Sequence, residues 1–248
     1  MMLSLIAALL APQAPGPWQL EKLEIGCRVS RFEAGGVTLG FETFLTGSGT
    51  TMLVSAPKDQ LPDGRGSIRL GTGPGQGADV NFGAFALADP KLKLLKIFPA
   101  PAVLASIASA QTLEIGPSIR LPGAGIDAAL KGLGDCTAGL LTSWGVDPQL
   151  WRDGRIAGYR GAPQSWFTDE DARTLLPRGV ASGTVTLLMT TSAEGSASSC
   201  KVVASSDPRL NAPTCSIAMR RSRYRAPLDA GGKPIASYVA VPVRWTRP

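Results

Sequence analysis

The chain has 248 residues, enough for one large domain or two small ones that each bury a hydrophobic core. Its 44% hydrophobic content is that of a globular protein, and 29 Gly with 20 Pro favour a turn-rich, β-containing fold over a helical bundle. The formal net charge is +6 and there is no His, the commonest general base, so we expect no enzyme, no cofactor and no metal site.

Positive charge is concentrated towards the C-terminus. From Ala172 onward there are 11 Lys and Arg against 3 Asp and Glu, which leaves 14 of the 25 cations and 16 of the 19 acids before it. An acidic or anionic partner for the C-terminal part is therefore expected.

The chain begins with an apolar run from Met1 to Ala11, followed by Pro and small residues. This run is too short to span a bilayer and resembles the apolar region of a signal peptide, although it lacks the basic start. We expect residues 1–14 to be a cleaved export signal. An uncleaved start that keeps the protein near a membrane, and a buried strand or helix, are the alternatives.

Residues 17–145 are predicted to form a β-rich domain with one or two helices. Apolar and polar residues alternate from Trp18 to Phe44, which indicates two or three strands around the turn at 34–36. Further strands, separated by Gly and Pro, are expected at 51–55, 67–70, 79–87 and within 111–121. Helices are expected at 101–110 and 126–144. The elements together suggest a small antiparallel sheet or sandwich.

Residues 146–165 contain several Gly and Pro and little periodicity, so we expect a linker there and a second domain at 166–248. Trp166, at its start, is expected to pack in the core.

The four cysteines allow three pairings. The division into two domains favours Cys27 with Cys136 and Cys200 with Cys215, and an exported chain favours disulfides. Four buried free thiols in a cytosolic protein are the alternative. A zinc site is not expected, because there is no His and no C-x-x-C pair.

The C-terminal domain has the pattern β-β-α-β. Strands are expected at 184–190 and 200–204, joined by a hairpin, because the first run is rich in β-branched residues and ends in a turn cluster. Asn211 is a candidate helix N-cap, the helix ends in a group of Arg, and a final strand is expected at 235–245. The fold class predicted for the whole chain is α+β.

At these residues the sequence resembles the C-terminal domain of TonB energy transducers, over about residues 172–248. The matching positions are Gly183 and Val185, Ala193 and Gly195, Cys200, Val202, Ser205 and Ser206, Arg220 through Pro227, Gly232 to Pro234, and Val241 to Trp245. One departure is Leu176-Pro177, where the family usually carries Tyr-Pro.

The resemblance implies a periplasmic domain that engages a peptide of an outer-membrane receptor by β-strand addition and so supports transmembrane transport. Contacts are expected from Tyr238, Val239, Ala240, Val241 and Val243 of the final strand, and from Arg220, Arg221, Arg223 and Arg225. For the Arg group, a solvated helix end is the alternative. Since neither an inner-membrane anchor nor a long Pro-rich arm is visible, binding is expected more than energy transfer.

An envelope protein that uses the same fold for a fixed partner or for homodimerisation is the main alternative, and export with disulfides argues against nucleic-acid binding. Three motifs lack their usual companions: the Gly-rich runs 71–77 and 123–128, and the S-x-x-K of Ser55 and Lys58. A Ser55 enzyme is the weakest alternative.

Overall fold

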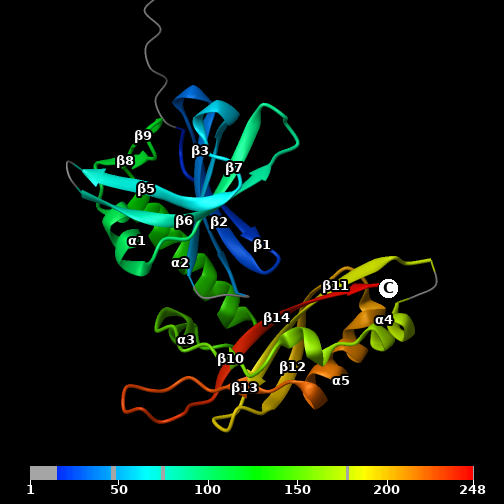
Figure 1. Ribbon diagram of the computed structural model, residues 1–248. Helices are drawn as coiled ribbons and strands as arrows, with labels where there is room; N and C mark the ends of the chain where they lie inside the picture. Colours follow the sequence, from blue (N-terminus) through cyan, green and yellow to red (C-terminus); the bar gives the residue numbers. More distant parts are fainter. Residues whose placement is uncertain (1–15, 46–48, 74–75, 177–178, 248) are drawn as a thin grey trace, which may run out of the picture. The chain divides into compact units, whose positions relative to one another are not determined.

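The computed structural model describes residues 16–45, 49–73, 76–176 and 179–247 (Figure 1). The expected export signal at 1–14 lies outside the described residues. Contacts divide the described residues into two compact units: unit 1 contains those within Met1–Glu21, Arg28–Glu42 and Thr50–Gly132, and unit 2 contains those within Lys22–Cys27, Thr43–Gly49 and Leu133–Pro248. These limits differ from those of the expected domains, whose division stays a prediction.

Unit 1 is built on a nine-stranded sheet with the order β1-β2-β3-β4-β7-β6-β5-β8-β9. The end of β1, the start of β2 and the end of β3 group with unit 2. The strands are β1 (Gln19–Leu23), β2 (Gly26–Glu33), β3 (Val37–Phe44), β4 (Thr50–Pro57), β5 (Arg65–Gly73), β6 (Gln76–Ala86), β7 (Leu92–Ile97), β8 (Thr112–Ile115) and β9 (Ile119–Pro122). The expected strands of this region are present, but they form one large sheet.

Strand β7 was not predicted, and a buried cation explains why. Along Leu92–Ile97 the buried positions are Lys93, Leu95 and Ile97, so the inward face includes a residue type that normally marks the solvent face. The Lys93 ammonium is satisfied there, since it donates to the Leu61 carbonyl at 2.9 Å and pairs with Asp63 at 2.6 Å.

Two helices accompany this sheet, α1 (Pro101–Ala108) and α2 (Ile126–Ser143), close to the expected limits (Figure 1). The side chains of Ile107 and Ile126 are fully buried. The turn between β2 and β3 also lies where it was expected. It requires glycine, because Gly35 and Gly36 have φ values of 76° and 77°.

Both expected disulfides are confirmed. Cys27 in β2 is bonded to Cys136 in α2, and Cys200 is bonded to Cys215, with Cα–Cα distances of 6.2 and 5.7 Å. The first bridge closes a separation of 109 residues and the second a separation of 15. Both therefore restrict the unfolded chain, the first more strongly.

The segment 146–165 contains regular structure where an irregular linker was expected. It includes α3 (Pro148–Arg152), β10 (Gly158–Tyr159) and most of a 3-10 turn at Pro163–Trp166. Asp147 caps α3 by accepting from the Gln149 backbone N–H. Trp166 is 5% exposed and packs in a hydrophobic core, as predicted.

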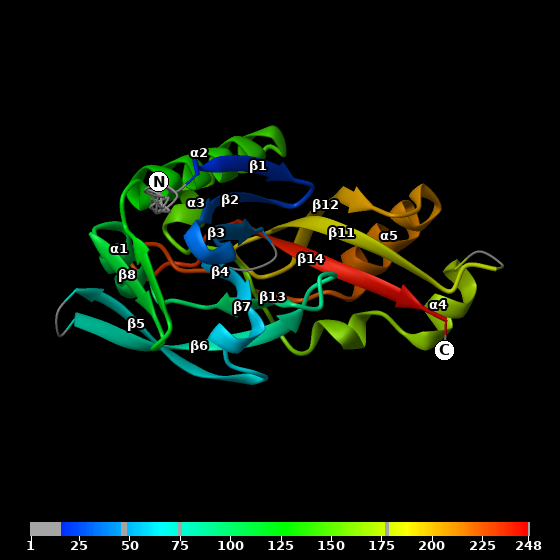
Figure 2. The ribbon, with the colours of Figure 1, turned by 90° about the horizontal axis from the view of Figure 1, so that it is seen from above.

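A three-stranded sheet with the order β12-β11-β14 organises the C-terminal part (Figure 2). Its elements are β11 (Ser182–Thr191), β12 (Ala197–Ser205), α5 (Asn211–Arg221) and β14 (Ser237–Thr246), preceded by α4 (Asp169–Leu175). The predicted β-β-α-β order and the α+β class are confirmed. A short strand, β13 (Tyr224–Arg225), is additional and pairs with β10.

The N-cap prediction at Asn211 is wrong. The cap position is Leu210, and Asn211 is the first helical residue, with no side-chain capping hydrogen bond. The reason is a preceding 3-10 turn at Pro208–Leu210, which leads directly into α5 and is itself capped by Asp207.

Both faces of the three-stranded sheet carry buried side chains. One cluster joins residues of α5, such as Ile217 and Ala218, to Val185, Leu187 and other strand residues. The second cluster contains Leu188, Tyr238 and Ala240 with Leu140 and Leu141 of α2. Among the described residues, no helix is both long enough and apolar enough to cross a membrane.

Candidate binding edge of the C-terminal sheet

Strand β14 lies at one edge of the three-stranded sheet, and among the described strands it pairs with β11 alone. The pairing is antiparallel and runs without a register shift from Ser182↔Thr246 to Thr191↔Ser237. Just beyond it, the Arg247 backbone N–H donates to the Ala181 carbonyl at 3.0 Å. Because hydrogen-bonded pairs alternate along such a ladder, odd-numbered residues of β14 direct their backbone groups to β11, and even-numbered residues direct theirs outward.

The other edge strand, β12, is less regular. Its pairing with β11 shifts register between Thr186 and Leu187 and again between Thr190 and Thr191. Such irregularities interrupt the row of groups that an added strand would need. The regular edge of this sheet is therefore β14.

The side chains of β14 fix the strand firmly in the domain. Val239, Val241, Val243 and Trp245 are buried, and the Trp245 indole N–H donates to the Thr214 hydroxyl in α5 at 3.0 Å. The predicted contact residues Val239, Val241 and Val243 thus have their side chains in the core and their backbone groups directed to β11. Their partner-binding role stays a prediction.

The first half of the outward edge is already occupied. The Tyr238 carbonyl accepts from the Ala157 backbone N–H at 2.9 Å, and the Ala240 carbonyl accepts from the Tyr159 hydroxyl at 3.1 Å. The Ser237 hydroxyl donates to the Arg155 carbonyl. Two of the predicted contact residues, Tyr238 and Ala240, therefore have their outward carbonyls engaged within the same chain.

The second half, Pro242–Thr246, is open. The side chains of Pro242, Arg244 and Thr246 are exposed. Pro242 has no N–H. Four outward backbone groups make no hydrogen bond with a described residue: the carbonyls of Pro242 and Arg244 and the N–H groups of Arg244 and Thr246. The Arg244 guanidinium makes no ion pair with a described residue. This open half is a short row of unpartnered backbone groups beside an available cation.

The predicted Arg group does not form one uniform surface. Arg221 bridges α5 to α4, because it pairs with the Asp171 carboxylate and donates to the Trp166 carbonyl at 3.0 Å. The Arg221 guanidinium, hydrogen-bonded to Asp171, lowers the pKa of that carboxyl from 3.8 to about 2. Arg221 therefore has a structural partner.

The three other members of the group are exposed. Arg223 donates to the carbonyls of Arg220 and Ser222 at the end of α5, and Arg220 contacts the Ser216 hydroxyl. Arg225 belongs to β13. The contacts of Arg223 with the end of α5 agree with the alternative interpretation, while a steering role for the group stays a prediction.

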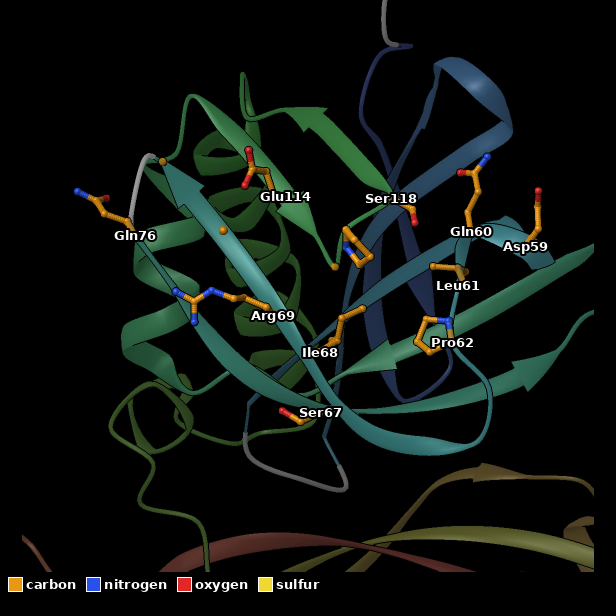
Figure 3. A pocket seen from close by; sticks show the side chains of 14 residues that line it. Asp59, Gln60, Leu61, Pro62, Ser67, Ile68, Arg69, Gln76, Glu114 and Ser118 are labelled. Atoms are coloured by element: carbon orange, nitrogen blue, oxygen red, sulfur yellow. The ribbon is translucent and has the colours of Figure 1, made fainter.

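Unit 1 contains a pocket of about 790 Å³ between β5, β8 and the turn before β5 (Figure 3). Buried Leu61 and Ile68 line it together with the polar residues Gln60, Arg69 and Glu114. Figure 3 shows Arg69 and Glu114 pointing in different directions, and each lies near another partner, Asp79 at 4.0 Å and Arg120 at 3.6 Å. The polar groups therefore do not converge on one point.

A buried carboxylate marks a second, smaller hollow of about 290 Å³ in unit 1. The Glu42 side chain is 1% exposed, and its two oxygens contact Arg28 and Lys96, each at 2.9 Å. Ser55 lines this hollow from β4, whereas Lys58 lies in the following 3-10 turn. The S-x-x-K pair is thus not on a helix, where residues three apart lie side by side.

Within the described parts of the chain, no group of three or more Cys, Asp and Glu is placed to hold a metal ion. In the Gly-rich run 71–77, residues 71–73 end β5 and residues 76–77 begin β6, whereas the run 123–128 comprises the turn before α2 and the first residues of that helix.

Sequence reasoning missed the segment Arg155–Tyr159, called the strap below. Its Ile-Ala-Gly-Tyr run contains only a two-residue strand, and its partners in β14 are about 80 residues away. The sequence feature that could have indicated this segment is Tyr159, because an aromatic residue between Gly158 and Arg160 suggests a side chain that packs against the domain.

Comparison with known proteins bears on this sheet. Residues 178–246 match the family model described as Gram-negative bacterial TonB protein C-terminal, whereas no curated protein and no solved structure matches the chain. The match covers β11, β12, α5, β13 and β14. Domains of this family are binding and energy-transducing domains of the bacterial envelope, not enzymes. The C-terminal segment of the chain, residues 178–246, is therefore a member of the TonB C-terminal domain family.

Proposed function

We propose that the C-terminal domain binds an extended segment of an outer-membrane receptor by adding it as a fourth strand beside β14. The observation that carries this proposal is the row of unpartnered backbone groups at Pro242, Arg244 and Thr246, on the regular edge of a TonB-family sheet. Edge strands of this kind are the usual docking sites for extended peptides.

The open half offers four groups to a partner: the carbonyls of Pro242 and Arg244 and the N–H groups of Arg244 and Thr246. Each hydrogen bond is worth about 0.5–1.5 kcal/mol net, so the backbone alone supplies about 2–6 kcal/mol before the cost of ordering the partner. That range is typical of a weak, reversible complex. The exposed Arg244 side chain favours a segment with an acidic residue beside it.

The proposed location is the periplasm. Two disulfides and the absence of free cysteines among the described residues fit an oxidising compartment. We propose export by the N-terminal segment, with attachment to a membrane through an uncleaved segment as its alternative. Mass spectrometry of the mature N-terminus distinguishes the two.

The substitution Arg244→Pro tests the docking edge. It removes the outward N–H of Arg244 but no hydrogen bond to β11, so the sheet itself is retained. The matched control, Arg244→Gln, removes the charge and keeps the N–H. In calorimetric titration with synthetic N-terminal segments of outer-membrane receptors, Arg244→Pro is expected to weaken binding at least ten-fold and Arg244→Gln by less.

Equal affinity of Arg244→Pro and the wild-type protein would refute the β14 edge as the docking site. The same open edge is also available to a second copy of the chain. A stable homodimer in sedimentation experiments, dissociated by Arg244→Pro and without affinity for receptor segments, would favour the alternative of a homodimeric envelope protein.

A further inference from the structure

We infer that the strap, Arg155–Tyr159, competes with the partner strand for the first half of the β14 edge, and that Tyr159 determines how many partner residues can pair. This inference rests on the proposed function, because it concerns the same edge. It assigns a specificity-determining role to a segment that lies before the family match.

The strap makes the contacts that a longer partner strand would make. The Ala157 N–H donates to the Tyr238 carbonyl at 2.9 Å, as a neighbouring strand does in a β-ladder. Two residues further along, the Tyr159 hydroxyl replaces a backbone donor at the Ala240 carbonyl, at 3.1 Å. Both outward carbonyls before Pro242 are thus taken.

The strap is held from its other side by contacts that do not involve β14. Gly158 and Tyr159 pair with Arg225 and Tyr224 in the small β10-β13 ladder. The Tyr159 ring lies edge-on to Trp166, with 5.7 Å between centroids, and 6.5 Å from the Tyr224 ring. The strap can therefore give up its bonds to β14 while β10 stays paired with β13.

Pro242 divides the two halves of the edge. It lacks the N–H that would continue the outward row, so a partner on Pro242–Thr246 does not need the carbonyls of Tyr238 and Ala240. A partner that extends back to Tyr238 needs both, and it must displace the strap first. Short and long segments are consequently expected to respond differently to any change at Tyr159.

The substitution Tyr159→Phe tests this directly, since it keeps the packed ring and removes only the hydroxyl bonded to Ala240. Tyr224→Phe is the matched control, because Tyr224 lies outside β14, its ring is 6.5 Å from the Tyr159 ring, and its buried hydroxyl has no hydrogen-bond partner in the described structure. The probes are two end-blocked peptides of alternating Val and Glu, one of five residues for the open half and one of nine for the whole edge.

Tyr159→Phe is expected to bind the nine-residue peptide about five-fold more tightly than the wild-type protein, because the competing contact loses one hydrogen bond. Affinity for the five-residue peptide is expected to stay unchanged, and Tyr224→Phe is expected to alter the affinity for neither peptide. Amide hydrogen exchange at Ala157 should accelerate when the nine-residue peptide binds, and not with the shorter peptide.

The inference alone is overturned if both peptides bind and Tyr159→Phe leaves the nine-residue affinity unchanged. It is equally overturned if the nine-residue peptide binds without faster exchange at Ala157. If neither peptide binds any of the three proteins, the proposed strand addition is wrong, and the competition is rejected with it.

Discussion

The ion pair between Asp171 and Arg221 connects α4 to α5, and its removal should weaken the C-terminal domain in a pH-dependent manner. Asp171 is 15% exposed and also closes the capping box of α4, where its carboxylate accepts from the Thr168 backbone N–H at 2.8 Å. The substitution Asp171→Asn keeps the size and an acceptor oxygen but removes the charge.

The size of the effect follows from the lowered pKa. The Asp171 carboxyl has a pKa of about 2 in the folded protein against 3.8 when free. Without screening by water, this difference would correspond to about 2.5 kcal/mol of unfolding free energy. The Arg221 side chain is 39% exposed, so water screens the pair and about 1 kcal/mol is a realistic loss for Asp171→Asn at neutral pH. Because the folded-state pKa is depressed, the contribution is complete above about pH 4 and disappears as the pH falls towards 2.

Urea denaturation of the wild-type protein and Asp171→Asn from pH 7 to pH 2 measures this contribution. The control is Asp169→Asn, in the same helical turn, because Asp169 makes no ion pair with a described residue. The difference between wild type and Asp171→Asn should be about 1 kcal/mol at pH 7 and close to zero at pH 2. A difference that is independent of pH, or that Asp169→Asn reproduces, would refute the role of the Arg221 pair.

Two further predictions concern stability. Replacing Cys27 and Cys136 by Ser should lower the free energy of unfolding by about 5 kcal/mol, and replacing Cys200 and Cys215 by Ser should lower it by about 3 kcal/mol. The first loss is larger because the first bridge closes the longer loop. Equal losses in guanidinium titrations would contradict this explanation by chain entropy. Glu42→Gln should lower the free energy of unfolding by about 2 kcal/mol, which is less than the loss for a fully buried ion pair, because water can reach Arg28 and Lys96. An unchanged denaturation midpoint would show that the buried carboxylate does not contribute to stability.

Features that depend on local pattern could be predicted from the sequence. The strands around the turn at 34–36, helix α2 and the order β11, β12, α5, β14 follow from periodicity and turn residues. The disulfide pairing followed from the expected separation of the two domains. Where a local rule fails, as with the buried Lys93 in β7, the strand was missed.

Features that depend on contacts between distant residues could not be predicted. The Arg221 pair joins positions 50 residues apart, and the strap reaches Ala240 across 81 residues. The accessible part of β14 also depends on register, since a shift by one residue exchanges inward and outward groups. The sequence therefore indicated an edge strand of this sheet, but not which of its backbone groups are open.

Amide hydrogen exchange along β14, with and without a bound receptor segment, tests the central proposal most directly. Strand addition predicts new protection at the amides of Arg244 and Thr246, whose N–H groups point outward, and little change at Val243 and Trp245, which already donate to β11. Protection that appears along β12, or nowhere in the three-stranded sheet, would contradict the assignment of β14 as the binding edge.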